Sequence, residues 1–250
     1  MNIHINKELH DYLQSIKLFE IKFGSHLKGK SNDTSDSDIL VIVKSHKAVV
    51  AAPLYTNHLL QYKGDNVDYV YVSEVQFFHN IVNAESAIFH EILRYNALNN
   101  TPFQFLNKIN FLTHDTLKCY LGLMKRDLKA SSANFKDKKV AKKKFQFFVE
   151  SYLYLSSTLL DLGVGHSEFS DNYTEFSESI DHNQIIIKAM RQKLNDLWLE
   201  GRIKKTISFN DLMLITDYLN NVELLPNNQY SDIILGIYLK EIQNENCTML

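Results

Sequence analysis

The chain is poor in the residues that break or cross-link regular structure. Its 250 residues include 8 glycines, 3 prolines and 2 cysteines. Cys119 and Cys247 are too few and too far apart for a disulfide framework or a zinc-ligand pattern, which fits a reducing cytosol. The opening residues lack the apolar core of a secretory signal, and no run approaches the roughly 20 apolar residues that cross a bilayer. We therefore expect a cytoplasmic protein with no membrane partner.

Charge is nearly balanced over the whole chain but uneven along it. The net charge of −2 gives no general reason to bind nucleic acid or a membrane surface. From Lys125 to Lys144, however, nine of twenty residues are lysine or arginine, against two aspartates. Such a segment is most often a solvated helix face. It can also bind RNA, or a nucleotide's phosphates through Arg126 or one of Lys142, Lys143 and Lys144.

Hydrophobic periodicity predicts an α/β arrangement at the N-terminus. Apolar residues at helical spacing predict a helix over residues 6–16, with Asn6 as its N-cap. Runs rich in β-branched and aromatic residues predict strands at 18–23, 39–43 and 67–72. Ser73 and Gln76 form a capping-box pattern that begins a helix directly after the third strand.

After about residue 105 the strand patterns stop and only helical patterns follow. The fold class expected is α+β, with a small mixed β-sheet and helices in residues 1–105. An all-helical domain is expected over residues 106–250. There is no internal repeat or low-complexity linker between them.

Two of the scarce glycines lie in one stretch, FGSHLKGKSNDTSDSDILVIV, at residues 23–43. From Gly24 to Ser31 it matches the P-loop pattern G-x-x-x-x-G-K-[ST], in which Lys30 would reach the phosphates. A P-loop needs a helix that begins at the Gly-Lys-Ser. Here turn-forming residues and then a strand follow, and the acids precede the strand instead of ending it. The P-loop is therefore the weaker interpretation.

The stronger interpretation makes Asp36 and Asp38 metal ligands. Residues two apart on a strand project from the same side, so these carboxylates would repel each other unless a divalent cation bridges them. Gly24 and Ser25 offer backbone amides and a hydroxyl to phosphate oxygens, and Asp68 stands at the head of the next strand. Three carboxylates, two metal ions and a triphosphate would make a two-metal nucleotidyl-transfer site.

The spacing Gly24-Ser25, ten residues, Asp36-Ser37-Asp38 resembles the signature of the DNA polymerase β-like nucleotidyltransferase superfamily. Asp68 matches the third acid of that family. The subgroup most similar comprises bacterial and phage proteins described as RNA-repair nucleotidyltransferases, which share Gly-Ser-His, here ending at His26. The core resemblance covers roughly residues 15–95 and is weaker as far as residue 165.

Two positions depart from the family pattern. Gly29 comes one position later than the glycine that often follows Gly-Ser, which leaves the loop shape open. Ser37 stands between the acids, where an apolar or aromatic residue is commoner. Neither change removes a predicted metal ligand.

The resemblance implies a nucleotidyltransferase core in residues 1–105 and an enzyme that uses Mg²⁺ or Mn²⁺. It would transfer an NMP from an NTP, with ATP the first choice, to an acceptor hydroxyl. Asp36 and Asp38 would hold both metals, and Asp68 the metal nearer the attacking oxygen. The residues expected at the phosphates are Gly24, Ser25, His26, Lys28, Lys30, Arg126 and Lys143.

The sequence does not decide which kind of molecule carries the acceptor hydroxyl. An RNA end, tRNA included, is the first choice, because of the subgroup resemblance and the basic segment 125–144. A protein hydroxyl is the second, as in small nucleotidyltransferases that AMPylate toxin partners, and a small molecule such as an antibiotic is the third. A non-catalytic nucleotide- or RNA-binding protein is a different class, and three mutually repelling acids argue against it.

Three further residues are expected to have structural roles. Glu91 lies among apolar residues at helical spacing and is expected to pair with Arg94 or a loop amide. His79 and His90 have no cysteine or acid cluster at ligand spacing and are expected to pack.

Overall fold

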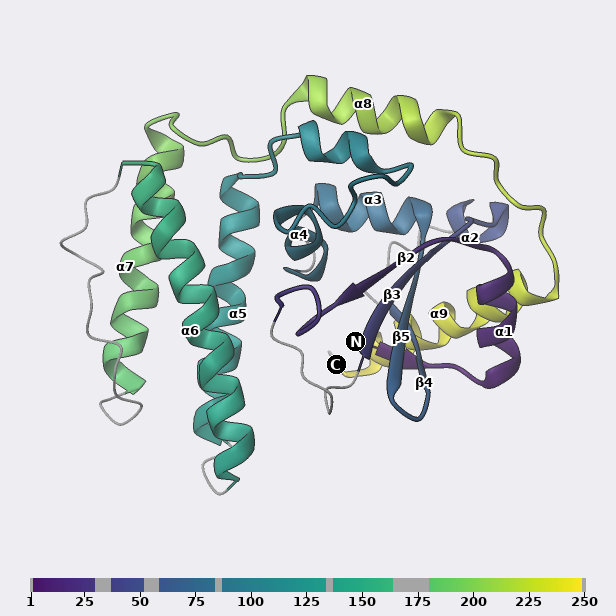
Figure 1. Cartoon of the computed structure of the whole chain (residues 1–250), viewed down its shortest axis with the longest axis horizontal. Helices are drawn as coiled ribbons and strands as arrows, with labels where there is room; N and C mark the ends of the chain where they lie inside the picture. The colour runs from purple at the N-terminus through teal and green to yellow at the C-terminus, as the bar shows by residue number, and fades with distance from the viewer. Residues whose placement is uncertain are drawn as a thin grey trace. The chain divides into compact units, whose positions relative to one another are not determined.

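The computed structural model describes residues 2–29, 37–51, 59–83, 87–133, 137–163 and 180–248. The chain divides into two compact units (Figure 1). The first unit combines Met1–Ile109 with Phe209–Leu250, and the second is Asn110–Ser208. The predicted boundary near residue 105 lies close to the first junction. The predicted helical domain over 106–250 is not one compact unit, because its last segment belongs to the first unit.

The first unit contains a five-stranded sheet and the helices around it. Its strands are β1 (Asn2–His4), β2 (Lys17–Phe23), β3 (Ser37–Val43), β4 (Leu59–Lys63) and β5 (Val67–Ser73). Its α-helices are α1 (Lys7–Ser15), α2 (Lys47–Ala51), α3 (Glu74–Val82), α4 (Ala87–Arg94), α8 (Phe209–Asn220) and α9 (Gln229–Thr248), with a 3-10 helix, η1 (Gln104–Lys108).

The sheet is mixed, with the strand order β1-β4-β5-β3-β2. β3 and β5 are parallel neighbours in its centre, and β2 pairs with β3 in the antiparallel direction. The predicted α+β class and three predicted strands are confirmed. β1 and β4 were not predicted. Both are short, and their pairing with each other and with β5 defines them as strands.

Local capping signals explain where the first helices begin. The Asn6 side chain accepts a hydrogen bond from the Leu9 backbone N–H at 2.9 Å, as its N-cap position predicts. The Ser73 hydroxyl accepts one from the Gln76 N–H at 3.2 Å and starts α3 directly after β5. The helix expected after β5 is therefore confirmed.

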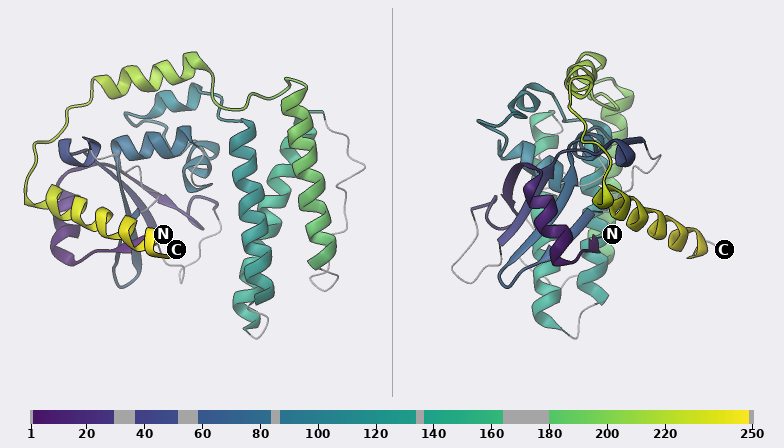
Figure 2. Two further views of the ribbon diagram at one scale, coloured as in Figure 1. Left: turned by 180° about the vertical axis from the view of Figure 1, so that it is seen from behind. Right: turned by 90° about the vertical axis from the view of Figure 1, so that its right-hand side faces the viewer.

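Helices cover both faces of the sheet (Figures 1 and 2). On one face α1 and α9 pack against alternate strand residues, in a buried cluster of Leu9, Leu13, Ile39, Val41, Val43, Leu60, Tyr71, Ile234 and Tyr238. The intervening residues, Leu40, Ile42, Val70 and Val72, project to the other face and are also buried. α3 contacts both β3 and β5. Burial of each such side chain stabilises the fold by about 1.5–3 kcal/mol.

The C-terminal segment returns to the first unit through specific backbone pairing. The Lys47 N–H donates to the Leu225 carbonyl at 3.1 Å, and the Leu225 N–H donates to the Ser45 carbonyl at 2.9 Å. The Asn227 side chain accepts the N–H of Ala48 at 2.7 Å. These bonds, with the burial of α9 on the sheet, explain why residues 209–250 do not belong to the second unit.

In its described residues, the second unit consists of three long helices. They are α5 (His114–Ala133), α6 (Lys138–Asp161) and α7 (Ile180–Leu199), and both α6 and α7 pack against α5. The chain after α7 comes back to the start of α5, where the His114 N–H donates to the Lys204 carbonyl at 2.9 Å. Within the part of the chain that the structure describes, no helix has the length and hydropathy needed to cross a membrane.

His90 is buried in α4, as the packing role predicted from its sequence context requires. Burial lowers its pKa to about 4. The folded state therefore binds fewer protons than the unfolded chain between this value and the ordinary histidine pKa of about 6.5. The stabilising effect of the neutral ring is complete above about pH 6.5 and is lost as the pH falls toward 4.

We expect the free energy of unfolding to fall by about 3 kcal/mol between pH 6.5 and 4 because of His90. Urea unfolding of the wild type and of His90→Gln at several pH values in this range gives the free energy of unfolding of each as a function of pH. The difference between the two slopes measures the contribution of His90. The matched control is His4→Gln, since His4 is exposed. Parallel pH profiles for the wild type and His90→Gln would contradict a buried neutral ring.

Candidate functional site

Asp38 and Asp68 lie side by side at the amino ends of two parallel strands. They are direct partners in the pairing of β3 with β5. Neighbouring strands are about 4.8 Å apart, and residues paired in this way project to the same face of a sheet. Both residues are partly exposed, and the Gln61 amide donates to Asp68 Oδ2 at 3.3 Å. The structure thus brings two of the three predicted acids together.

The third predicted ligand, Asp36, lies outside the described residues, and so does Lys30. Among the residues with a described position, no group of three histidine, cysteine, aspartate or glutamate side chains could hold a metal ion. Asp38 and Asp68 therefore form a pair whose proposed third member precedes β3 by one residue.

Gly24 holds the loop after β2 directly against the Asp38 carboxylate. Its φ angle is 65°, in the left-handed region that favours glycine. A Cβ at this position would be 2.6 Å from Asp38 Oδ2, a separation that real side chains do not adopt. Gly29 has nearly the same φ, 64°, but nothing lies within 4 Å of its missing Cβ. Gly24 is thus favoured by its backbone angle, and a side chain at this position would also force the Asp38 carboxylate to shift.

The turn over residues 24–29 is closed by its own backbone and is tied to β3. The Lys28 N–H donates to the Gly24 carbonyl at 3.3 Å, and the Gly29 N–H donates to the His26 carbonyl at 3.2 Å. His26 Nε2 and Ser37 Oγ are hydrogen-bonded at 3.2 Å. Ser37, where the sequence departs from the family pattern, therefore helps to position the loop. Ser25 lies inside this turn and is partly exposed.

Lys28 connects the turn to α4. Its Nζ lies 2.9 Å from Glu91 Oε1, and the two side chains are only 17% and 21% exposed. Sequence reasoning expected Glu91 to be structural but proposed Arg94 or a loop amide as its partner. The actual partner is a side chain of the glycine turn, distant in sequence and without a local pattern that could have indicated it.

The Lys28–Glu91 pair is expected to be worth about 1–2 kcal/mol, between the values of exposed and buried ion pairs. Lys28→Met and Glu91→Gln should each lower the free energy of unfolding by that amount. The double variant should cost little more than either single one. Urea unfolding measures all three. Lys7→Met, which breaks the exposed Lys7–Asp11 pair, should cost less than about 0.5 kcal/mol. Fully additive losses would show that the two charges do not interact.

Arg126 and Lys143, predicted to contact phosphates, belong to the second unit. The Arg126 guanidinium donates from Nε and Nη2 to the two carboxylate oxygens of buried Asp127, each at 3.0 Å. Lys143 is exposed, and its Nζ lies 5.9 Å from the centroid of the Phe147 ring, over which Lys144 also lies at 5.6 Å. These contacts all stay within the second unit.

The donor set of the first unit could hold a divalent cation. Mg²⁺ prefers oxygen ligands and takes only one or two carboxylates when a phosphate supplies the rest. Asp38 and Asp68 offer carboxylates on one face of the sheet, and the glycine turn leaves no side chain between Gly24 and Asp38. The turn begins at Gly24, which packs on Asp38, and its Lys28 ammonium is paired with Glu91.

No protein-family model, curated protein or solved structure matches this chain. Any functional conclusion therefore depends on the motif at residues 24–38 and on the geometry of the acid pair and its turn.

Proposed function

We propose that the chain is a metal-dependent nucleotidyltransferase that transfers a nucleoside monophosphate from an NTP to an acceptor hydroxyl. The observation that carries the proposal is the direct pairing of Asp38 with Asp68 beneath a glycine turn that packs on Asp38. Two carboxylates of like charge at neighbouring positions are costly without a bridging cation. A turn built around Gly24 beside them suits phosphate oxygens better than side chains.

In the proposed mechanism, Asp36, Asp38 and Asp68 hold Mg²⁺ or Mn²⁺. When bound, the divalent ions neutralise phosphate charge and raise the acidity of the acceptor hydroxyl. The backbone amides and the Ser25 hydroxyl of the turn donate to phosphate oxygens, and Lys28 adds a positive charge next to them. The acceptor oxygen attacks the α-phosphorus in line as the bond to pyrophosphate breaks, so that no covalent enzyme intermediate is needed.

The exposed lysines of α6 favour an RNA end as the acceptor. Lys138, Lys139, Lys142 and Lys143 are all exposed on the first turns of α6 and supply positive charge for a phosphodiester backbone. RNA binding through them should weaken steeply as salt rises. A protein hydroxyl is the second candidate acceptor, and a small molecule is the third.

A label-transfer assay tests the proposal. Purified protein is incubated with Mg²⁺ or Mn²⁺, each α-³²P-labelled NTP in turn, total RNA and cell lysate. Label on RNA that is lost in Asp38→Asn supports the proposed enzyme and identifies both acceptor and base. Label on a protein band instead favours AMPylation of a partner.

The assay also separates the alternatives that do not transfer a nucleotide. Release of free phosphate from γ-labelled NTP, unchanged in Asp38→Asn and lost in Lys30→Met, would favour a P-loop phosphohydrolase and overturn the proposal. Nucleotide or RNA binding with no transfer to any acceptor would favour a non-catalytic binding protein.

A further inference from the structure

The face of the sheet that carries Asp38 and Asp68 continues beyond Asp68 onto β4. Lys63 is the register partner of Asp68 in the antiparallel pairing of β4 with β5. Because register partners project to the same face, Lys63 and Asp38 flank Asp68 from its two sides. A lysine therefore stands one strand away from the acid pair, a spacing of about 4.8 Å between backbones.

Two further polar residues extend this surface toward the edge of the sheet. Gln61 lies two residues before Lys63 on β4 and donates to Asp68 Oδ2 at 3.3 Å. His4, on the edge strand β1, is the parallel register partner of Gln61. Lys63 and His4 are exposed, and Gln61 is partly exposed. His4, Gln61 and Lys63 therefore form a polar edge beside Asp68 that a ligand can reach.

The Lys63 ammonium is not held by a carboxylate of the protein. Other cations are paired, as Lys28 is with Glu91 and Arg126 with Asp127. Within the part of the chain that the structure describes, no ion pair includes Lys63. Its charge is thus available to an anionic group of a ligand that lies over β4.

The two sides of the acid pair differ in a way that assigns them to different substrates. On the β2 side the glycine turn packs on Asp38, and this turn is proposed to receive the phosphates of the NTP. On the other side lie β5 and then β4, with Lys63. The assignment depends on the proposed function, in which Asp68 holds the metal ion nearer the attacking oxygen. The acceptor then approaches over β4.

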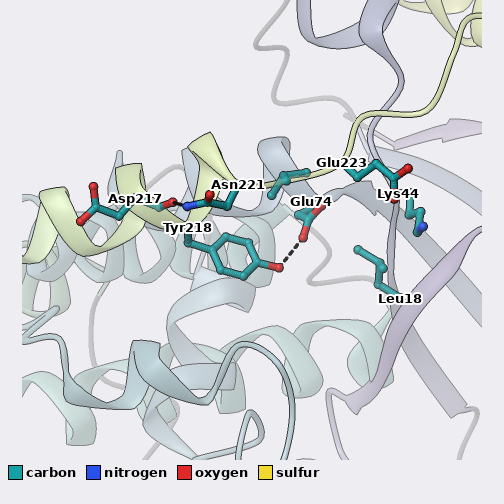
Figure 3. A pocket seen from close by; sticks show the side chains of 8 residues that line it. Leu18, Lys44, Glu74, Asp217, Tyr218, Asn221 and Glu223 are labelled. Carbon is teal, nitrogen blue, oxygen red and sulfur yellow. Dashed lines mark hydrogen bonds between the residues drawn. The ribbon is translucent and has the colours of Figure 1, made fainter.

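The cavity of the first unit shown in Figure 3 is not part of this acceptor side. It lies at the opposite, carboxyl ends of β3 and β5, where the Tyr218 hydroxyl donates to Glu74. Lys44, which lines it, follows Asp38 by six residues of extended chain, or about 20 Å. A group bound there is too far from the acid pair to present a hydroxyl to it.

We propose that Lys63 binds the last phosphodiester of a single-stranded RNA, so that the 3′-hydroxyl beyond this phosphate reaches Asp68. Charge complementarity favours this ligand, because an unpaired ammonium beside the attacking oxygen suits an acceptor that carries a phosphate next to its hydroxyl. A serine or tyrosine hydroxyl of a partner protein has no such phosphate. Gln61 positions the Asp68 carboxylate from the same strand.

Fluorescence anisotropy of a short single-stranded RNA, labelled at its 5′ end, tests the contact with the full chain, Mg²⁺ and no NTP. Lys63→Met should weaken binding by about fivefold. It should also lower the slope of log affinity against log salt by about 0.7, as expected for one phosphate contact. Equal affinity and slope in the wild type and in Lys63→Met would overturn the proposal.

Lys22→Met is the matched control. Lys22 is an exposed lysine of the same sheet, on β2. Its register partner is Ile39, whose side chain belongs to the cluster under α1, so Lys22 projects to the opposite face from the acid pair. Its RNA affinity and salt slope should equal those of the wild type.

A neutral methylphosphonate at the last linkage of the RNA locates the contact at the acceptor end. The wild type and Lys22→Met should bind this RNA about fivefold more weakly than the unmodified one. Lys63→Met should bind both RNAs equally, since the charge that the modification removes no longer has a partner. The same discrimination in Lys63→Met as in the wild type would place Lys63 away from this phosphate and overturn the proposal.

These binding measurements need no transfer, so they fail separately from the proposed function. Absence of label transfer, together with the expected Lys63 and methylphosphonate results, would overturn the transferase and leave the RNA contact. Transfer to RNA that is lost in Asp38→Asn, with Lys63→Met indistinguishable from Lys22→Met, would overturn the contact alone. Label on a protein band, without RNA binding that depends on Lys63, would overturn the RNA contact in favour of a protein acceptor.

Discussion

Asp68→Asn is expected to reduce the rate of nucleotidyl transfer by about a thousandfold or more. Loss of an outer-shell partner of a metal ligand already costs about 10–100-fold, and Asp68 is proposed as a direct ligand. Asp65→Asn is the matched control, because Asp65 is exposed in the turn between β4 and β5, three residues away. Initial rates with Mn²⁺ and the acceptor found by label transfer measure the effect.

Stability separates this loss of activity from misfolding. With EDTA present, Asp68→Asn should be at least as stable as the wild type, and more stable by up to about 1 kcal/mol, because it removes a like charge directly opposite Asp38. Mn²⁺ should raise the melting temperature of the wild type and of Asp65→Asn but not of Asp68→Asn. Activity within about threefold of the wild type in Asp68→Asn would refute the proposed ligand role.

Gly24→Ala is expected to lower the free energy of unfolding by about 3 kcal/mol, and Gly29→Ala by only about 1 kcal/mol. Both glycines have φ close to 65°, so both substitutions carry the same left-handed backbone cost. Only at Gly24 does the new methyl group meet an atom, Asp38 Oδ2 at 2.6 Å. The difference between the free energies of unfolding of the two variants, measured in urea, therefore gives the cost of the contact with Asp38 apart from the cost of the backbone angle.

A double-mutant cycle tests whether Asp38 is the source of the clash. Asp38→Ala removes the carboxylate and leaves its Cβ, which is 3.7 Å from the position of the added methyl, an ordinary contact. In that background Gly24→Ala should cost no more than Gly29→Ala. An equal cost of Gly24→Ala in both backgrounds would mean that the turn does not pack on Asp38.

The elements that sequence alone predicted are those whose causes are local. Asn6 and Ser73 cap α1 and α3 through bonds to backbone groups three residues away, and such bonds depend only on short-range geometry. The apolar runs of β2, β3 and β5 likewise contain their own strand signal. The motif from Gly24 to Asp38 could also be recognised in the sequence, because a glycine turn and alternating acids are local patterns.

Partners across the chain were not predictable in the same way. β1 and β4 are strands because they pair with each other, and the side chain that Glu91 contacts is Lys28. The return of residues 209–250 depends on the Leu225 pairing and on the burial of α9 against the sheet. Each of these contacts joins segments that are distant in sequence, so no local propensity encodes the identity of the partner.

The sequence by itself determined the α+β class, the early helix caps and a candidate acid motif, since each follows from neighbouring residues. Only the tertiary structure decided that Asp68 is the register partner of Asp38, and that Gly24 packs against that carboxylate. It alone brought the end of α8 together with Lys44 and Glu74. The physical reason is that register and cavities arise when distant segments bury apolar surface against each other, which a one-dimensional pattern does not specify.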